Sequence, residues 1–263
     1  MNLTVHFVDA FTDKVFHGNS AAVIVCKTWL DDSVMQSIAF ENNLSETAFI
    51  VEDKQDLFSI RWFSPLTEID FCGHATLASA FVLFTKDSMV SQLTFSAKAV
   101  GQIQVNKIDN GFIEMNFPNR KPEPISTIPE ALINGLSIKP EEVWRNQQAY
   151  FVVYNEEKMV RDVISQSDII KALAPYDVIV TAKSHQYDFI SRYFWPANGG
   201  DEDPVTGSAH AGLTPLWAEK LNKSTLKAYQ ASSRGGNLNC QLKGDRVLIS
   251  GQAVEYLVGT ISI

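Results

Sequence analysis

Two segments of the chain combine acidic residues, a short turn and the start of an apolar helix. One runs from Asp201 to His210 with the sequence DEDPVTGSAH, and apolar residues at helical spacing follow it up to Leu221. The other runs from Glu68 to Thr76 with the sequence EIDFCGHAT and leads into an apolar stretch that ends near Phe84. The N-terminus of a helix presents unpaired N–H groups and partial positive charge. Each segment could therefore hold an anion.

Three side chains in or near these segments could transfer protons. Glu46 precedes an apolar strand, where partial loss of water would raise the pKa of its carboxyl group and permit proton exchange near neutral pH. A solvated surface glutamate is the simpler interpretation of the same residue. His74 could instead be a helix cap or a hydrogen-bonded core residue, and Asp203 could form an Asx turn before Pro204.

A cysteine offers a different proton-transfer chemistry. Cys72 stands at the predicted start of the first helix, where a thiol has a lowered pKa and could act as a base. Epimerisation by two thiols would need a second cysteine, but Pro204 occupies the matching position in the second segment. Gly207, Ser208 and Thr76 also fit plain N-capping chemistry.

The order of the remaining elements predicts an α+β protein with two similar halves. Strands outnumber helices, and each half contains one long apolar helix that must be enclosed, which suggests a sheet curled around it. Three of the ten prolines lie between residues 118 and 124 and mark a linker. We expect domains at 1–118 and 119–263, with the last strand, about 253–263, as a candidate to complete the first. If a pseudo-twofold relates the halves, both helix starts would face one site.

Composition and charge exclude several classes of protein. The chain has 263 residues, a formal charge of −8 and 45% hydrophobic residues, as expected for a folded globular protein. A net negative charge disfavours nucleic acid or an anionic membrane as a partner. No basic, apolar leader or spanning segment is evident, and three cysteines without Cys-x-x-Cys spacing suit a reducing compartment. We therefore expect a cytoplasmic protein without a structural zinc site.

Several ordered motifs resemble those of the phenazine-biosynthesis PhzF-like isomerases, within the diaminopimelate epimerase-like superfamily. The motifs are GNSAAV at 18–23, NLSETAF at 43–49, EIDFCGHAT at 68–76, EDPVTGSA at 202–209 and RGG at 234–236. The resemblance covers essentially the whole chain and implies two pseudo-symmetric halves, each a mostly antiparallel, barrel-like sheet wrapped around a central helix. It departs at Ser20, where the family more often has proline.

The resemblance also implies roles for individual residues. Glu46 would be the general acid/base that moves a proton on a small carboxylated metabolite in the inter-domain cleft, and His74 and Asp203 would assist it. The substrate would be held by a further set of residues, namely Asn19, Ser45, Gly73, Gly207 and Ser208. No metal or organic cofactor is expected, and related proteins suggest a homodimer.

Two alternatives to this isomerase remain open from the sequence. One is an amino-acid-type epimerase that uses Cys72 together with Glu46 or Asp203. The other is a metabolite-binding protein that keeps the fold without turnover. The identity of the substrate does not follow from the fold or the family.

Overall fold

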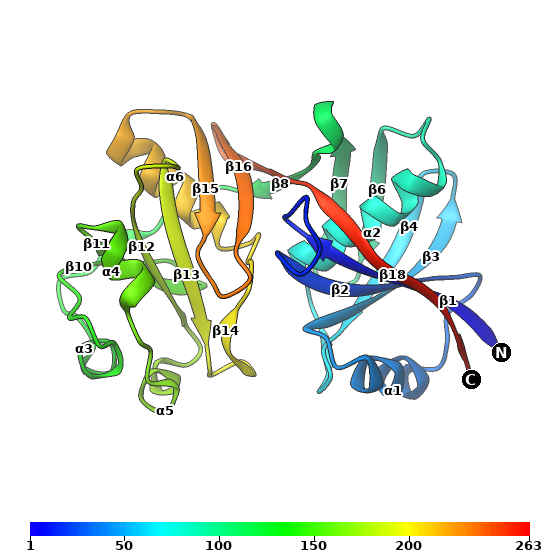
Figure 1. The fold of residues 1–263 in the computed structure, drawn as a ribbon, viewed down its shortest axis with the longest axis horizontal. Coiled ribbons are helices and arrows are strands. Elements are labelled where there is room, and N and C mark those ends of the chain that lie inside the picture. The colour runs from blue at the N-terminus through cyan, green and yellow to red at the C-terminus, as the bar shows by residue number, and fades with distance from the viewer. The chain divides into compact units, whose positions relative to one another are not determined.

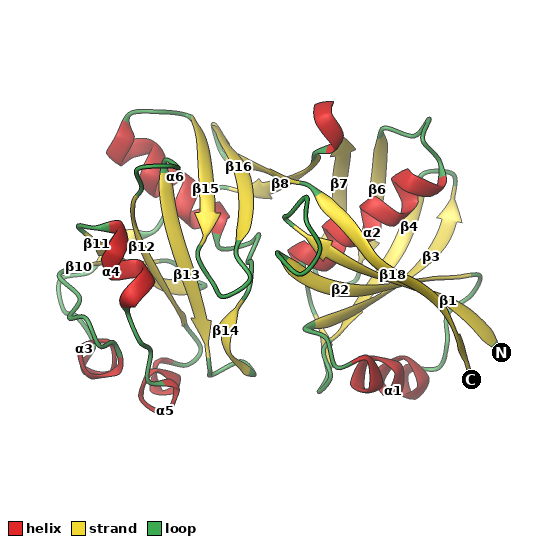
Figure 2. Ribbon diagram, in the orientation of Figure 1, coloured by secondary structure: helices red, strands yellow, loops and turns green.

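The computed structural model describes residues 1–263 and divides the chain into two compact units (Figure 1). Unit 1 comprises Met1–Asn116 and Ser250–Ile263, and unit 2 comprises Phe117–Ile249. The chain first crosses between the units beside the proline-rich segment 118–124. Both units consist mainly of strands with a few helices (Figure 2).

Unit 1 is built from a mixed sheet and two α-helices. Its strands are β1 (Asn2–Ala10), β2 (Asn19–Cys26), β3 (Glu46–Lys54), β4 (Leu57–Phe63), β5 (Glu68–Ile69), β6 (Gln92–Ala97), β7 (Gly101–Lys107), β8 (Ile113–Pro118) and β18 (Ala253–Ser262). Its helices are α1 (Asp32–Asn42), α2 (Gly73–Lys86) and the short 3-10 turn η1 (Asp109–Gly111). The last strand, β18, pairs with β1 along its length.

Unit 2 contains a comparable set of elements. Its strands are β9 (Glu123–Pro124), β10 (Glu142–Arg145), β11 (Ala149–Tyr154), β12 (Asp177–Lys183), β13 (Phe189–Trp195), β14 (Gly200–Asp203), β15 (Thr225–Gln230), β16 (Gly236–Lys243) and β17 (Arg246–Gly251). Its helices are α3 (Glu130–Gly135), α4 (Glu157–Asp162), α5 (Ser167–Ile170), η2 (Lys171–Leu173) and α6 (His210–Leu221).

The two units share one order of strand pairing. In unit 1, β1 and β2 are antiparallel, β2 and β3 parallel, β3 and β4 antiparallel, and β4 pairs in parallel with β6 after α2. In unit 2, the same relations join β10 to β11, β11 to β12, β12 to β13, and β13 to β15 after α6. Helices α2 and α6 are therefore equivalent crossovers that begin after short strands, β5 and β14.

Helix α2 lies inside its own sheet rather than on it. It contacts β1, β2, β3, β7 and β18, and nearly all of its residues are buried (Figure 1). A helix that is apolar around most of its surface is stable only when it is enclosed in this way. Helix α6 contacts β15 and β16, and its residues are buried from His210 to Ala218.

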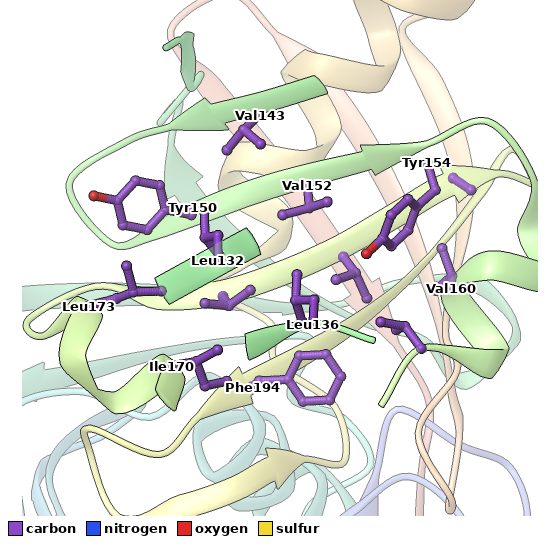
Figure 3. Packing of buried hydrophobic residues seen from close by; sticks show 14 of the residues in the cluster. Leu132, Leu136, Val143, Tyr150, Val152, Tyr154, Val160, Ile170, Leu173 and Phe194 are labelled. Atoms are coloured by element: carbon purple, nitrogen blue, oxygen red, sulfur yellow. The ribbon is translucent and has the colours of Figure 1, made fainter. Parts of the chain in front are cut away.

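A second apolar layer covers the other face of each sheet. In unit 2, residues of alternating strand positions pack against α3, α4 and α5, and Figure 3 shows this cluster around Val152, Leu136 and Phe194. In unit 1, Ile24 and Phe49 pack in the same manner against Met35 and Ile38 of α1. Strands buried on both faces explain the continuous apolar runs of β2 and β11, which strict alternation would not give.

The acidic segments before the two central helices are short strands, not the loops we expected. Glu68 of β5 receives two hydrogen bonds from Arg61 of β4, at 2.7 and 2.6 Å. Glu202 of β14 receives the equivalent pair from Arg192 of β13, at 2.7 and 2.9 Å. Each acid thus pairs with an arginine on the neighbouring strand, so both have structural partners.

No helix of the structure combines the length and the apolar character that a membrane-spanning helix requires.

We expect Leu77→Ala to destabilise unit 1 by about 2–5 kcal/mol, because Leu77 is fully buried in α2 and the enclosing strands cannot collapse onto the space it leaves. Urea unfolding followed by fluorescence would measure the change. The matched control Leu66→Ala, at a side chain that is 75% exposed, should alter the free energy of unfolding by less than about 0.5 kcal/mol. Equal effects of the two substitutions would contradict the enclosure of α2.

Candidate functional site

Glu46 is a buried carboxyl group at the first position of β3. The strand pairs in parallel with β2, where Ala21 lies opposite Glu46, and both strands are buried along most of their length. Asn43, in the left-handed conformation with φ of 48°, ends α1 and turns the chain into β3. The Glu46 residue is only 7% exposed. The carboxyl group is therefore held away from bulk water by the strand that carries it.

His74 contacts this carboxyl group from the first turn of α2. The N-cap residue is Cys72, so His74 lies within the helix and is not its cap. Its Nε2 lies 3.0 Å from Oε2 of Glu46, and His74 is 5% exposed. No donor meets Oε2 with hydrogen-bond geometry. The contact is thus a close charge pair whose carboxylate oxygen keeps acceptor capacity for another group.

Asn19 holds the opposite side of the imidazole ring. Its Nδ2 lies 3.1 Å from Nδ1 of His74, and its Oδ1 accepts a hydrogen bond of 3.4 Å from Ser45. In this arrangement Nδ1 is the acceptor, so the proton of a neutral ring sits on Nε2, the nitrogen that lies 3.0 Å from Oε2 of Glu46. If the Asn19 amide group is rotated by 180°, its oxygen accepts a hydrogen bond from Nδ1 of a charged His74 ring. Asn19 therefore suits both charge states of His74.

The loop before Asn19 is fixed by a buried acid that the sequence did not reveal as important. Asp9 accepts a hydrogen bond of 2.8 Å from the Phe16 N–H and another from the Ser20 hydroxyl. Gly18 has φ of +66°, and a side chain there would clash with the backbone of Ala10. Ser20 thus contributes its hydroxyl group to Asp9.

Charges around His74 set the protonation of the cluster. Burial opposes a positive ring, yet the neighbouring Cys72 and Glu46 raise the pKa of His74 well above its usual 6.5. Burial, together with the charge of Glu46, also raises the pKa of the Cys72 thiol to about 11. Because Cys72 is then a neutral thiol at physiological pH, we attribute the higher pKa of His74 to Glu46.

The raised pKa of Cys72 corrects our expectation of a reactive thiolate at a helix N-terminus. Its Sγ lies 3.4 Å from Nδ1 of His74, and the Ala75 N–H also favours the thiolate. Burial outweighs both effects. The location at the start of a helix does not lower the pKa where the surroundings exclude water and hold a carboxylate.

In unit 2, Asp203 ends β14 and begins the turn that leads to α6. Its carboxylate accepts a hydrogen bond from the Thr206 hydroxyl. Gln230 of β15 braces the same turn, since its Nε2 donates to the Asp203 carbonyl and its Oε1 accepts from the Thr206 N–H, both at 2.8 Å. Gln230 is fully buried, and the sequence did not predict its contact with Asp203, which lies 27 residues away in the chain.

Ser208 accepts a hydrogen bond of 3.0 Å from Nε2 of Gln148 and does not cap α6 through its side chain. The same Nε2 donates to the Tyr193 hydroxyl, also at 3.0 Å, which in turn donates to Asp177. Asn198 donates to the other oxygen of Asp177 at 2.7 Å. Both hydrogens of the Gln148 amide are therefore used, and the Ser208 hydroxyl hydrogen is left to donate elsewhere.

The second helix also begins without a side-chain cap. His210 donates from Nδ1 to the Thr206 carbonyl at 2.9 Å, and burial lowers its pKa to about 4. The pKa of His210 is thus shifted in the opposite direction to that of His74 in α2. Gly207 is buried, and its carbonyl accepts the first hydrogen bond of the helix from the His210 N–H, at 3.1 Å.

The predicted site residues fall into two groups. In unit 1, Glu46, His74, Asn19 and Ser45 form one hydrogen-bonded or ion-paired cluster, with Gly73 beside His74 at the start of α2. In unit 2, the residues Asp203, Gly207 and Ser208 belong to the turn before α6. The contacts that sequence reasoning missed are those of Asp9, Gln148 and Gln230, whose partners lie on other elements.

Comparison with known proteins identifies relatives along the whole chain. The phenazine biosynthesis-like (PhzC-PhzF) family matches residues 8–259. An uncharacterized isomerase from Pseudomonas aeruginosa is 44% identical over 263 residues and is covered fully, as is this chain. A crystal structure of a PhzF-family phenazine biosynthesis protein from Enterococcus faecalis aligns over 100% of both chains, with 43% identity and a TM-score of 0.93. A hydroxyproline epimerase from Agrobacterium vitis, at 10% identity and a TM-score of 0.64 over 99% of this chain and 92% of its own, shares the fold.

Two units with the same strand pairing, each with a buried crossover helix, define an α+β protein of the diaminopimelate epimerase-like class. Within this class, the chain belongs to the phenazine biosynthesis-like family and is an isomerase. The fold class and the family predicted from the sequence motifs are confirmed.

We expect histidine-selective NMR titration to separate the two buried histidines. The pKa of His74 should lie well above 6.5 and fall in Glu46→Gln, while His210 should titrate near 4 in both proteins. The raised pKa of His74 stabilises the folded state below pH 6.5, and this contribution is lost as pH rises through the folded pKa. The lowered pKa of His210 has the opposite effect, so its contribution is lost as pH falls from 6.5 toward 4. A His74 midpoint at or below 6.5 would contradict the charge pair.

Proposed function

We propose that this isomerase shifts a proton on a small carboxylated metabolite, without a cofactor, and that Glu46 is its general acid/base. The observation that carries this proposal is the buried Glu46 carboxylate, 3.0 Å from His74, whose Oε2 lacks a well-aligned donor. A base of this kind must be shielded, held in place and free to accept a proton. Glu46 meets all three requirements.

His74 supports the proposed proton transfer in two ways. As a cation, it stabilises the carboxylate form of Glu46 through the 3.0 Å contact, and it can return a proton to Glu46 or to the substrate. Asn19 holds the His74 ring in this orientation through its contact with Nδ1. Glu46 would thus remove a proton from one carbon of the substrate, and the Glu46–His74 pair would deliver one to another position.

The beginnings of α2 and α6 are suited to hold the substrate carboxylate. Neither helix has a side-chain cap, and the N-terminus of a helix favours an anion. In α6 the N–H groups from His210 to Gly212 already donate to carbonyls three residues earlier, so the turn before this helix would contact the substrate. In our proposal, Gly73 and Ser45 serve this purpose in unit 1. Gly207 and Ser208 serve it in unit 2, where the hydroxyl of Ser208 is oriented to donate by Gln148.

We further propose that both units contribute to one substrate site in the inter-domain cleft, with Asp203 assisting Glu46 in proton handling. The repeated pairing order supports this proposal, because it puts an acid, a turn and a helix start at equivalent positions of both units. The homodimer and the cytoplasmic location expected from the sequence stay predictions.

The epimerase alternative, with Cys72 as a base, is less favoured. A thiol whose pKa is about 11 is almost entirely protonated near neutral pH and cannot remove a proton from carbon. Cys72 could still act as an acid. A screen for proton exchange with variants of both residues therefore distinguishes Cys72 from Glu46 as the base.

We expect Glu46→Gln to lower turnover by about 10²- to 10⁴-fold, since a positioned acid/base contributes about that much. Proton exchange of small amino and hydroxy carboxylic acids in D₂O, followed by NMR, would identify an active compound and measure the loss. Glu52→Gln, an exposed glutamate on the same strand, is the matched control and should keep full activity. Cys72→Ser should keep most of the exchange.

Full proton exchange by Glu46→Gln would exclude the proposed mechanism. Loss of proton exchange in Cys72→Ser, but not in Glu46→Gln, would favour the epimerase. If carboxylates raise the melting temperature but none exchanges a proton, the chain is a metabolite-binding protein.

We expect Gln148→Leu to weaken carboxylate binding rather than catalysis, because Ser208 would lose the donor that orients its hydroxyl. With an active compound from the screen, KM should rise by about tenfold, the value of one lost hydrogen bond to a charged group, and kcat should change little. Gln148→Asn shortens the side chain and should raise KM in the same way. The distant Gln104→Leu is the control and should leave KM and kcat unchanged. A fall in kcat alone would contradict the positioning role.

A further inference from the structure

The Glu46, Cys72 and His74 side chains together present three metal-ligating atoms in one buried cluster. One ligand atom from each residue lies within 4.8 Å of the other two. Sγ of Cys72 lies 3.4 and 3.9 Å from the two ring nitrogens of His74, and Nε2 lies 3.0 Å from Oε2 of Glu46. Ligands of a tetrahedral zinc ion, at about 2.0–2.3 Å from the metal, are separated by roughly 3–4 Å. The cluster is therefore close to the required spacing.

We propose that this cluster is a binding site for a thiophilic divalent cation such as Zn²⁺, with Cys72, His74 and Glu46 as ligands. The burial of all three side chains supports it, because Glu46, Cys72 and His74 are each at most 7% exposed and their ligand atoms face one another away from bulk water. A cation at this position would replace the ion pair that joins Nε2 of His74 to Oε2 of Glu46 at 3.0 Å.

The chemistry of the donors selects the metal. One thiolate, one imidazole nitrogen and one carboxylate oxygen suit Zn²⁺ or Co²⁺, whereas Mg²⁺ and Ca²⁺ require several oxygen ligands. Binding releases the thiol proton of Cys72 and the Nε2 proton of His74 to solvent. The two anionic ligands then balance the charge of the metal, which permits its burial, and a fourth position stays open for water or a substrate oxygen.

Metal binding at this site would inhibit the enzyme. This consequence rests on the proposed function, since the metal would occupy Oε2 of Glu46 and Nε2 of His74, the two atoms assigned to proton transfer. The binding of metal itself does not depend on that assignment. Failure of one proposal can therefore be distinguished from failure of the other.

Zn²⁺ titration of the full, reduced chain by calorimetry tests the site directly. We expect one high-affinity site per chain, no binding of Mg²⁺, and an affinity at least about tenfold lower in Cys72→Ala and in Glu46→Gln. Cys240→Ala, which removes another buried thiol, and His6→Gln, which removes the exposed pair with Glu255, should bind Zn²⁺ as the unsubstituted chain does. Thermal unfolding would establish that each variant is folded.

Co²⁺ provides a readout that does not depend on affinity. A thiolate-to-cobalt absorption band should appear with the unsubstituted chain and with Cys240→Ala, and be absent with Cys72→Ala. Absence of Zn²⁺ binding, unchanged affinity in Cys72→Ala, or a cobalt spectrum without the thiolate band would overturn the proposal. Inhibition of proton exchange by Zn²⁺, reversed by a chelator, would extend it to regulation of the enzyme.

Discussion

The site depends on the burial of a carboxylate beside an imidazole that can carry a positive charge. Removing the Glu46 carboxylate from water is costly unless a partner compensates for the lost hydration, and His74 is that partner at 3.0 Å. The pair is incompletely satisfied, because Oε2 lacks a well-aligned donor. A carboxylate with more hydrogen-bond donors would be more stable but a weaker proton acceptor. The residual acceptor capacity is therefore the feature that the proposed chemistry requires.

Enclosure of the central helix makes this arrangement possible. Because α2 is surrounded by strands, its first turn is fixed in place and His74 cannot move away from β3. Asp9 and Gly18 fix the loop that carries Asn19 against the same ring. Positioning of the site thus relies on elements from three parts of the chain, and the apolar core supplies the rigidity that a catalytic contact needs.

The two units use one topology for different purposes. Equivalent arginine–glutamate pairs, Arg61–Glu68 and Arg192–Glu202, join equivalent strands. Yet acidic neighbours raise the pKa of His74 in α2, while burial lowers the pKa of His210 in α6, beside a backbone carbonyl and a phenylalanine ring, to about 4. The difference arises from the presence of Glu46 next to one ring and of no acid next to the other.

Ordered motifs and apolar periodicity are local properties of the chain, so the fold class, the family and the two acid–turn–helix segments could be predicted from the sequence. It also indicated Glu46 and His74 as candidate proton-transfer groups. The raised pKa of the buried Cys72 thiol, the ion pairs of Glu68 and Glu202, and the contact of Gln148 with Ser208 emerge only in the folded structure. These outcomes depend on burial and on partners far away in the chain, and a pKa or a hydrogen bond is set by those neighbours rather than by adjacent residues.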